Sequence, residues 1–121
     1  MLVLFDNGTP RTLARYLIDH HTVTEARARG WGELENGDLL KAAEEAGFEV
    51  LVTTDKNISY QQNLTNRKIA IVVLGAGRWS IVKPHVEQVV LAVNEATSGS
   101  FAEVEIPLPP KKPFTRSRTG S

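Results

Sequence analysis

The run Ile69-Ala-Ile-Val-Val-Leu74, followed directly by Gly75-Ala-Gly77, is the stretch of sequence that decides the fold class. An uninterrupted apolar run bounded by turn-forming glycines is typical of a strand that is buried on both faces, as strands in parallel sheets are. It is also the longest apolar run of the chain, and it is far shorter than the roughly 20 residues that cross a bilayer. The run therefore predicts a central strand covered by helices on both sides.

Short apolar or alternating runs on either side of this strand predict the rest of the sheet. Strands are expected over residues 2–5, 22–24 and 48–53, and an edge strand over 101–106. Helical patterns separate these runs, so the order along the chain is β-α-β-α-β-α-β-α-(β). This alternation predicts a three-layer α/β/α domain with a mainly parallel central sheet.

Helix boundaries are marked by capping and breaking residues. Thr9 followed by Pro10 predicts a helix whose first N–H groups are capped by the threonine hydroxyl. Asn36 is expected to cap the next helix, and Gly47 is expected to end it. Further helices are predicted over residues 58–64 and 82–93.

The composition excludes several classes of protein. The chain has 121 residues, of which 41% are hydrophobic and 23% charged, as in an ordinary globular domain. It has no cysteine, which excludes disulfide scaffolds, thiolate zinc sites and cysteine nucleophiles. Residues 1–5 lack the basic region of a signal peptide and run into Asp6. We therefore expect one soluble cytoplasmic domain without a membrane span.

The zero net charge is the sum of two unlike parts. Residues 1–107 hold ten basic and 14 acidic residues, a net charge of −4, and residues 108–121 carry +4. The second segment contains three prolines and almost no apolar residues, so we expect a disordered basic tail after a domain of residues 1–107. Such a tail would add salt-sensitive attraction to phosphate.

Three aspartates stand where a ligand site is expected. Asp6 follows the first strand, Asp55 follows the strand at 48–53, and Asp38 lies in the first turn of the helix that Asn36 caps. Ligands gather at the carboxyl ends of parallel strands, and grouped carboxylates repel one another unless a hard cation such as Mg²⁺ binds. Each aspartate also suits a structural role, in a turn or at a helix start.

Three motifs around these aspartates resemble the PIN-like domains. They are Leu4-Phe-Asp6-Asn, Asp38-Leu-Leu-x-x-Ala and Val50-Leu-Val-Thr-Thr-Asp55-x-Asn57. The similarity covers roughly residues 1–96 and is greatest to a small PIN-like family related to the toxins of bacterial toxin–antitoxin pairs.

This resemblance implies a metal-dependent ribonuclease that uses Mg²⁺ or Mn²⁺. Asp6, Asp38 and Asp55 would be its catalytic and metal-binding acids. Asn57 stands where relatives often carry another aspartate, and it could bind the metal only through its neutral carbonyl oxygen. Glu33 and Glu35 are the candidates for the missing carboxylate. The resemblance also implies a homodimer and, as a partner, a cognate antitoxin protein.

RNA binding would require cations near the acidic residues. Arg11 and Arg15 lie four residues apart on the first predicted helix, and Arg78 precedes Trp79 after the glycine turn. A guanidinium and an aromatic ring there could contact phosphate and base. The alternative is that the two arginines of the helix form a solvated face and that Trp79 belongs to the core.

The expected function is thus a toxin-like, metal-dependent endoribonuclease. One alternative is a PIN-like binding or regulatory module with weak or no catalysis, because Asn57 contributes no charge and the body of the chain is acidic. Another is a partner-binding protein whose tail or last strand docks onto a cognate protein. Other signals are weaker. Gly75-Ala-Gly77 is only part of a dinucleotide fingerprint, since Ser80 holds the third glycine position. The adjacent His20 and His21 are expected to point apart rather than to chelate a metal.

Overall fold

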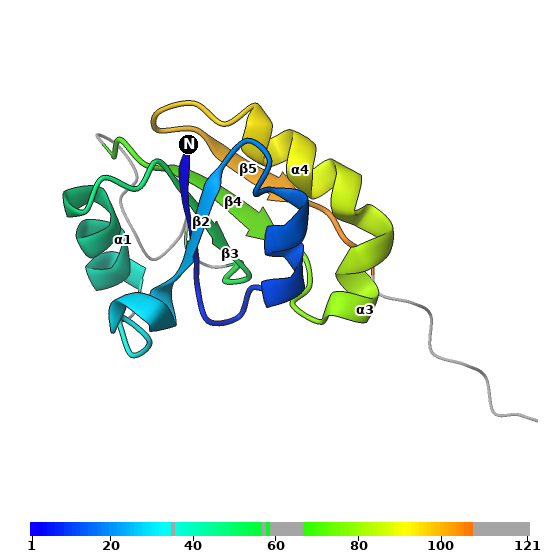
Figure 1. Cartoon of the computed structure of the whole chain (residues 1–121), viewed down its shortest axis with the longest axis horizontal. Coiled ribbons are helices and arrows are strands. Elements are labelled where there is room, and N and C mark those ends of the chain that lie inside the picture. The colour runs from blue at the N-terminus through cyan, green and yellow to red at the C-terminus, as the bar shows by residue number, and fades with distance from the viewer. Residues whose placement is uncertain (35, 57, 59–66, 108–121) are drawn as a thin grey trace, which may run out of the picture.

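The computed structural model describes residues 1–34, 36–56, 58 and 67–107. The tail predicted over 108–121 and most of the helix predicted over 58–64 lie outside the described residues. The strands of this described part are β1 (Leu2–Phe5), β2 (Thr22–Glu25), β3 (Val50–Thr53), β4 (Ala70–Leu74) and β5 (Phe101–Val104). They form one sheet in the order β2-β1-β3-β4-β5, and every neighbouring pair is parallel (Figure 1). The predicted α/β class with a parallel sheet is therefore confirmed.

Several of the helical segments are single turns. In the described residues they are the 3-10 helices η1 (Arg11–Tyr16), η2 (Ala26–Arg29) and η3 (Lys83–His85), and the α-helices α1 (Asn36–Glu45), α3 (Trp79–Val82) and α4 (Val86–Asn94). The last predicted helix starts earlier than expected, at Trp79, and it is divided by η3. Pro84 lies in η3 and has no N–H to donate to a preceding carbonyl, which accounts for the division.

The prediction that Thr9 caps the first helix is wrong. The residue before η1 is Pro10, and η1 has no side-chain cap. The Thr9 hydroxyl instead lies 2.8 Å from Asp6 Oδ1 and 2.8 Å from Val52 O, and it shares its single proton between these two acceptors. The Thr9 hydroxyl, which the sequence predicts as a helix cap, thus bonds to Asp6 at the end of β1 instead.

The predicted end of α1 at Gly47 is confirmed. Gly47 has φ +89°, a left-handed conformation that favours glycine. Its N–H donates to Glu44 O at 3.1 Å, and the N–H of Phe48 donates to Ala43 O at 2.9 Å. These bonds satisfy the last carbonyls of the helix and turn the chain into β3.

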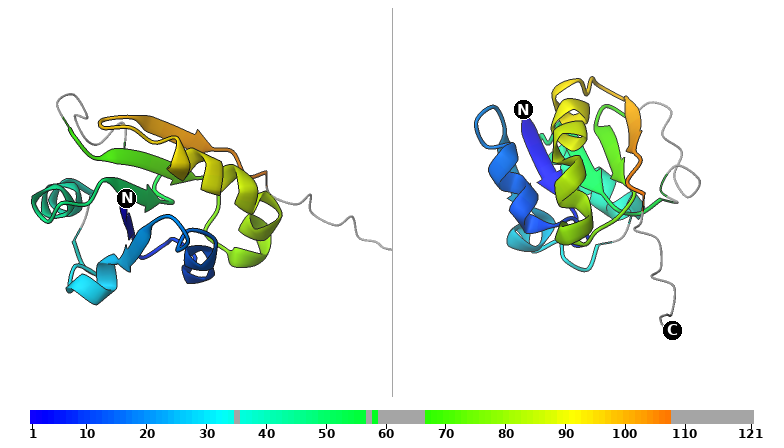
Figure 2. Two further views of the ribbon diagram at one scale, coloured as in Figure 1. Left: turned by 45° about the horizontal axis from the view of Figure 1, so that its top comes forward. Right: turned by 90° about the vertical axis from the view of Figure 1, so that its right-hand side faces the viewer.

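Both faces of the sheet are covered by apolar side chains. Val3, Phe5, Val52 and Leu74 project to one face and pack against side chains of η1, α3 and α4. Leu4, Leu51, Ile71 and Val73 project to the other face and pack against Leu39, Leu40 and Ala43 of α1. Figure 2 (right) shows η1 and α4 running side by side over the first face. The burial of every residue of β4 follows from this double coverage.

Within the described ranges, the molecule has no helix whose length and apolar character would allow it to traverse a lipid bilayer.

Candidate functional site

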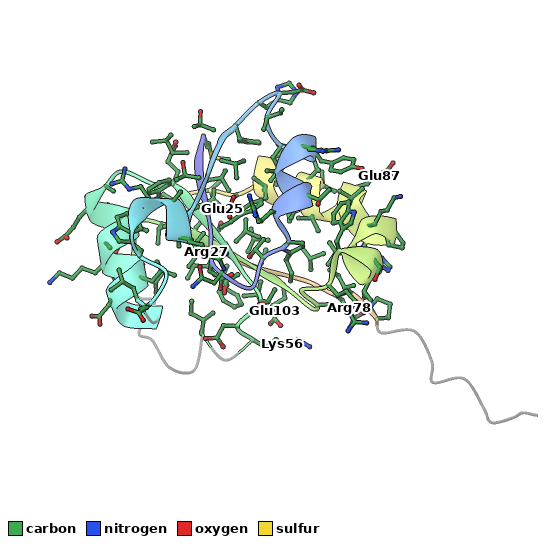
Figure 3. All side chains as sticks on the ribbon, turned by 60° about the horizontal axis from the view of Figure 1, so that its bottom comes forward. Glu25, Arg27, Lys56, Arg78, Glu87 and Glu103 are labelled. Atoms are coloured by element: carbon green, nitrogen blue, oxygen red, sulfur yellow. The ribbon has the colours of Figure 1, made fainter. Side chains whose placement is uncertain are left out.

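Two of the predicted site residues lie at the same edge of the sheet. β1 and β3 are hydrogen-bonded neighbours, with Phe5 opposite Val52, so Asp6 and Asp55 both follow strands that end at this edge. Both side chains are partly buried. Lys56 directly follows Asp55, and Figure 3 shows the side chains of Lys56, Glu103 and Arg78 on one side of the molecule. The sequence predicts that Asp6 and Asp55 meet at one end of the sheet if their strands are neighbours. β1 and β3 are neighbours.

The Asp6 carboxylate is held by donors on both of its oxygens. Oδ1 accepts the Gly8 N–H at 3.1 Å and lies against the Thr9 hydroxyl, and Oδ2 accepts the hydroxyl of Thr53. The backbone N–H of Asp6 donates to Val52 O at 3.1 Å. The structural role of Asp6 in a turn is therefore present, and the same contacts fix the direction of its carboxylate.

Thr53 connects the two aspartates. It is the last residue of β3, and its exposed fraction is 2%. Its hydroxyl donates to Asp6 Oδ2 and accepts the backbone N–H of Asp55 at 3.1 Å. Sequence reasoning missed this residue. The available signal was a threonine at a strand end directly before Thr54-Asp55, where a buried hydroxyl needs polar partners.

The loops after β1, β3 and β4 approach one another closely beside the aspartates. A Cβ atom on Gly8 would lie 2.4 Å from Thr54 Oγ1, and one on Gly77 would lie 2.7 Å from Gly8 O. Both separations are shorter than real Cβ contacts. Glycine is required at Gly77, where the opposing atom is backbone, whereas a side chain at Gly8 would require the Thr54 side chain to move. The Gly75–Gly77 segment therefore serves loop–loop packing at the site.

Asp38 does not join the other two aspartates in a metal-binding cluster. It is exposed in the first turn of α1, because the next two residues, Leu39 and Leu40, face the core. In residues 1–34, 36–56, 58 and 67–107, no three Asp, Glu, His or Cys side chains are grouped so that they could hold a metal ion. Glu33 is exposed, and Glu35 and Asn57 lie outside the described residues.

The predicted cationic residues differ in their surroundings. Arg11 Nε lies 3.2 Å from Glu25 Oε2, and this pair is exposed, with 76% of the arginine side chain accessible. Arg15 and Arg78 are also exposed. Trp79 is partly buried against the first face of the sheet, and its ring lies 5.7 Å from that of Tyr16. Trp79 thus packs against the core without being fully buried, whereas Arg15 and Arg78 present accessible charge.

The site thus combines the carboxylate of Asp6, the hydroxyls of Thr9 and Thr53, and Asp55 at the carboxyl ends of β1 and β3. No family model, curated protein or solved structure matches this chain.

Proposed function

We propose that the chain is a metal-dependent endoribonuclease with a three-layer, PIN-like α/β/α arrangement. The observation that carries this proposal is the link between Asp6 and Asp55, which follow adjacent parallel strands and share the hydroxyl of Thr53. The apolar clusters on both faces of the sheet support the three layers. Substrates of open α/β sheets bind at the carboxyl ends of the strands, which is where these acids lie.

The ligands at this edge fit Mg²⁺ or Mn²⁺ in a site that RNA helps to complete. Mg²⁺ prefers oxygen ligands, keeps several waters, and is commonly held by one or two carboxylates together with substrate phosphates. Asp6 and Asp55 supply carboxylates, and Oδ2 of Asp6 accepts only the Thr53 hydroxyl among the described residues, which leaves acceptor capacity on that oxygen. When bound, the metal would orient the phosphodiester and lower the pKa of an attacking water.

The side chains of the chain itself would position the acids and the substrate. Thr53, Thr9 and the Gly8 N–H hold the Asp6 carboxylate in one direction, which lowers the entropy that the site loses on binding. Arg78 is exposed at the start of α3, directly after the loop that touches Gly8, and we assign it to an RNA phosphate. Arg15, which lies on η1, is assigned to a more distant phosphate of the RNA. Arg11 is not assigned to RNA binding, because its charge is paired with that of Glu25.

The test is cleavage of unstructured and structured RNA by the purified chain, with Mg²⁺ or Mn²⁺ and then with a chelator. We expect cleavage that requires the metal and that falls on the order of 100-fold in Asp6→Asn and in Asp55→Asn. Asp19→Asn is the matched control, because Asp19 is exposed beside Met1 and Leu2, away from this edge. Thermal unfolding of each variant separates loss of activity from loss of fold. Cleavage that persists in the Asp6→Asn, Asp55→Asn double variant would refute the proposal.

A second candidate function is a binding or regulatory module without catalysis. It is favoured by the donors that already engage Asp6 and by the absence of a three-acid group in the described part of the chain. Paramagnetic relaxation of water by Mn²⁺ distinguishes the two functions. Catalysis requires Mn²⁺ binding that Asp6→Asn and Asp55→Asn both weaken. RNA binding that is equal in wild type and in both variants, with no bound Mn²⁺, supports the module.

A further inference from the structure

The outer side of β5 exposes backbone hydrogen-bonding groups. The N–H of Ile71 donates to Ser100 O at 2.9 Å, and the N–H of Gly75 donates to Val104 O at 3.0 Å. In a parallel pair, alternate residues bond to the neighbouring strand, so the backbone groups of Phe101 and Glu103 point away from β4. β5 is the last strand of the sheet in the described part of the chain. An additional strand could therefore pair there.

A groove lies on each side of this edge. One has a volume of about 530 Å³ and is lined by Lys56, Gly75 and Ile106, among others. The other has a volume of about 340 Å³ and is lined by Gln88, Leu91 and Glu95, among others. Both grooves are also bordered by the same part of the edge, Glu103–Glu105. Because side chains alternate along a strand, a segment paired with β5 would place successive side chains in the two grooves.

The chemistry of these surfaces specifies the partner. Exposed acids, Glu95, Glu103 and Glu105, border the grooves, and Lys56 is the one cation among their described lining residues. Leu91 is 55% exposed and Phe101 is 37% exposed, which gives the edge apolar contacts as well. A second copy of β5 would bring a second set of Glu103 and Glu105 to the same edge, and the repulsion between these like charges disfavours self-pairing.

We propose that the outer edge of β5 is the docking surface for an extended, lysine- or arginine-rich segment of a partner protein, which adds to the sheet as its next strand. Backbone bonds to Phe101 and Glu103 supply affinity, and the acidic grooves select basic side chains. The proposal does not rest on the proposed ribonuclease reaction, although Lys56 and Gly75 place one of the two grooves beside the candidate site. The competing explanation is that the glutamates only protect an edge strand from aggregation, in which case no such segment binds.

The test uses the full chain and a short synthetic peptide that alternates lysine and valine, with binding followed by calorimetry and by NMR. We expect the amide resonances of Phe101 and Glu103 to shift and the affinity to fall by roughly tenfold in Glu103→Lys, Glu105→Lys. The matched control is Glu45→Lys, Glu87→Lys, which makes the same change in net charge at exposed residues outside both grooves. We expect that control to bind as wild type does.

A second peptide separates strand pairing from simple charge attraction. It keeps every lysine and carries proline at alternate positions, so that it cannot donate a ladder of backbone hydrogen bonds. We expect it not to bind. Equal affinity for both peptides, or for both double variants, would overturn the proposal. Binding that appears only after removal of residues 108–121 would also overturn it, because the chain's own segment would then be the occupant.

Discussion

Thr53 is the residue on which the geometry of the candidate site depends most directly. Its buried hydroxyl bonds to Asp6 Oδ2 and to the backbone N–H of Asp55. Replacement by valine removes the hydroxyl and leaves two polar groups without their partner, so we expect Thr53→Val to destabilise the chain by about 1–3 kcal/mol. Thr53→Ser keeps the hydroxyl and should restore most of this loss. Urea unfolding of the two variants measures the difference, and equal stability would show that the two bonds contribute nothing.

A second residue, Glu44, links stability to pH at the other end of the sheet. Its carboxylate accepts bonds from Arg67 Nη1 at 2.5 Å and from the N–H groups of Lys68 at 2.7 Å and Ile69 at 3.3 Å. Burial raises the pKa of Glu44, but these hydrogen bonds and the positive charge of Arg67 outweigh burial and leave the pKa below its ordinary value of 4.5. The stabilising contribution is therefore complete above pH 4.5 and is lost as the pH falls through the lowered pKa.

We therefore expect Glu44→Gln to reduce the free energy of unfolding by about 1–3 kcal/mol at neutral pH. The gap between wild type and variant should close in strong acid, where wild-type Glu44 is also uncharged. Urea unfolding across this pH range measures it. Glu45→Gln is the control, since Glu45 is the exposed next residue of α1. If the difference in unfolding free energy between wild type and Glu44→Gln stayed constant with pH, the negative charge of Glu44 would not be the source of its stabilisation.

Single residues show where sequence reasoning succeeds and where it stops. Asp6 and Asp55 could be predicted at the edge, because an acid directly after an apolar strand has a defined position. The roles of Thr9 and Thr53 could not, because their hydroxyls bond across strands that are 43 or more residues apart in sequence. The sequence correctly predicts Asp38 in the first turn of α1. Which way its side chain points could not be predicted, because that depends on how α1 packs on the sheet.

Among the elements, the strands were more predictable than the helices. Each strand is an apolar or alternating run, and its burial follows from that composition. The last helical segment is divided at Pro84, and the segment after Pro10 is a 3-10 helix and not the α-helix that its start signal suggests. The loops between elements were predictable as turns. Their mutual contacts at Gly8 and Gly77 were not, because those contacts depend on strand order.

Two glycines with different requirements give a prediction at this scale. A Cβ on Gly77 would lie 2.7 Å from the backbone oxygen of Gly8. A Cβ on Gly47 would meet no atom within 4 Å, but an alanine there would have to adopt the left-handed backbone angle φ +89°. We expect both Gly→Ala variants to lose about 1–2 kcal/mol. Only Gly77→Ala should also weaken Mn²⁺ binding, since it separates the loops beside Asp6. Water relaxation by Mn²⁺ tests this, and equal binding by the two variants would contradict it.

For the whole molecule, the order of the strands decides which residues meet. The sequence predicts parallel strands but not that β1 lies between β2 and β3, and this neighbour relation brings Asp6 and Asp55 to one edge. The same order leaves β5 at the outside. The candidate ribonuclease site and the proposed docking edge therefore both follow from topology, which a single sequence constrains through the right-handed crossover rule without fixing it.

The division of charge along the chain gives the last prediction. Residues 1–107 supply both apolar clusters and carry −4, and residues 108–121 carry +4. A chain that ends at Pro107 should therefore unfold at the same urea concentration as the full chain. Its RNA affinity should be lower and less sensitive to salt, because each cation that contacts single-stranded RNA contributes about 0.7 to the slope of log K against log salt. Titration at several salt concentrations measures that slope. An unchanged slope would mean that Lys111, Lys112, Arg116 and Arg118 do not contact the RNA, and that the positive charge for its phosphates comes from the folded part of the chain.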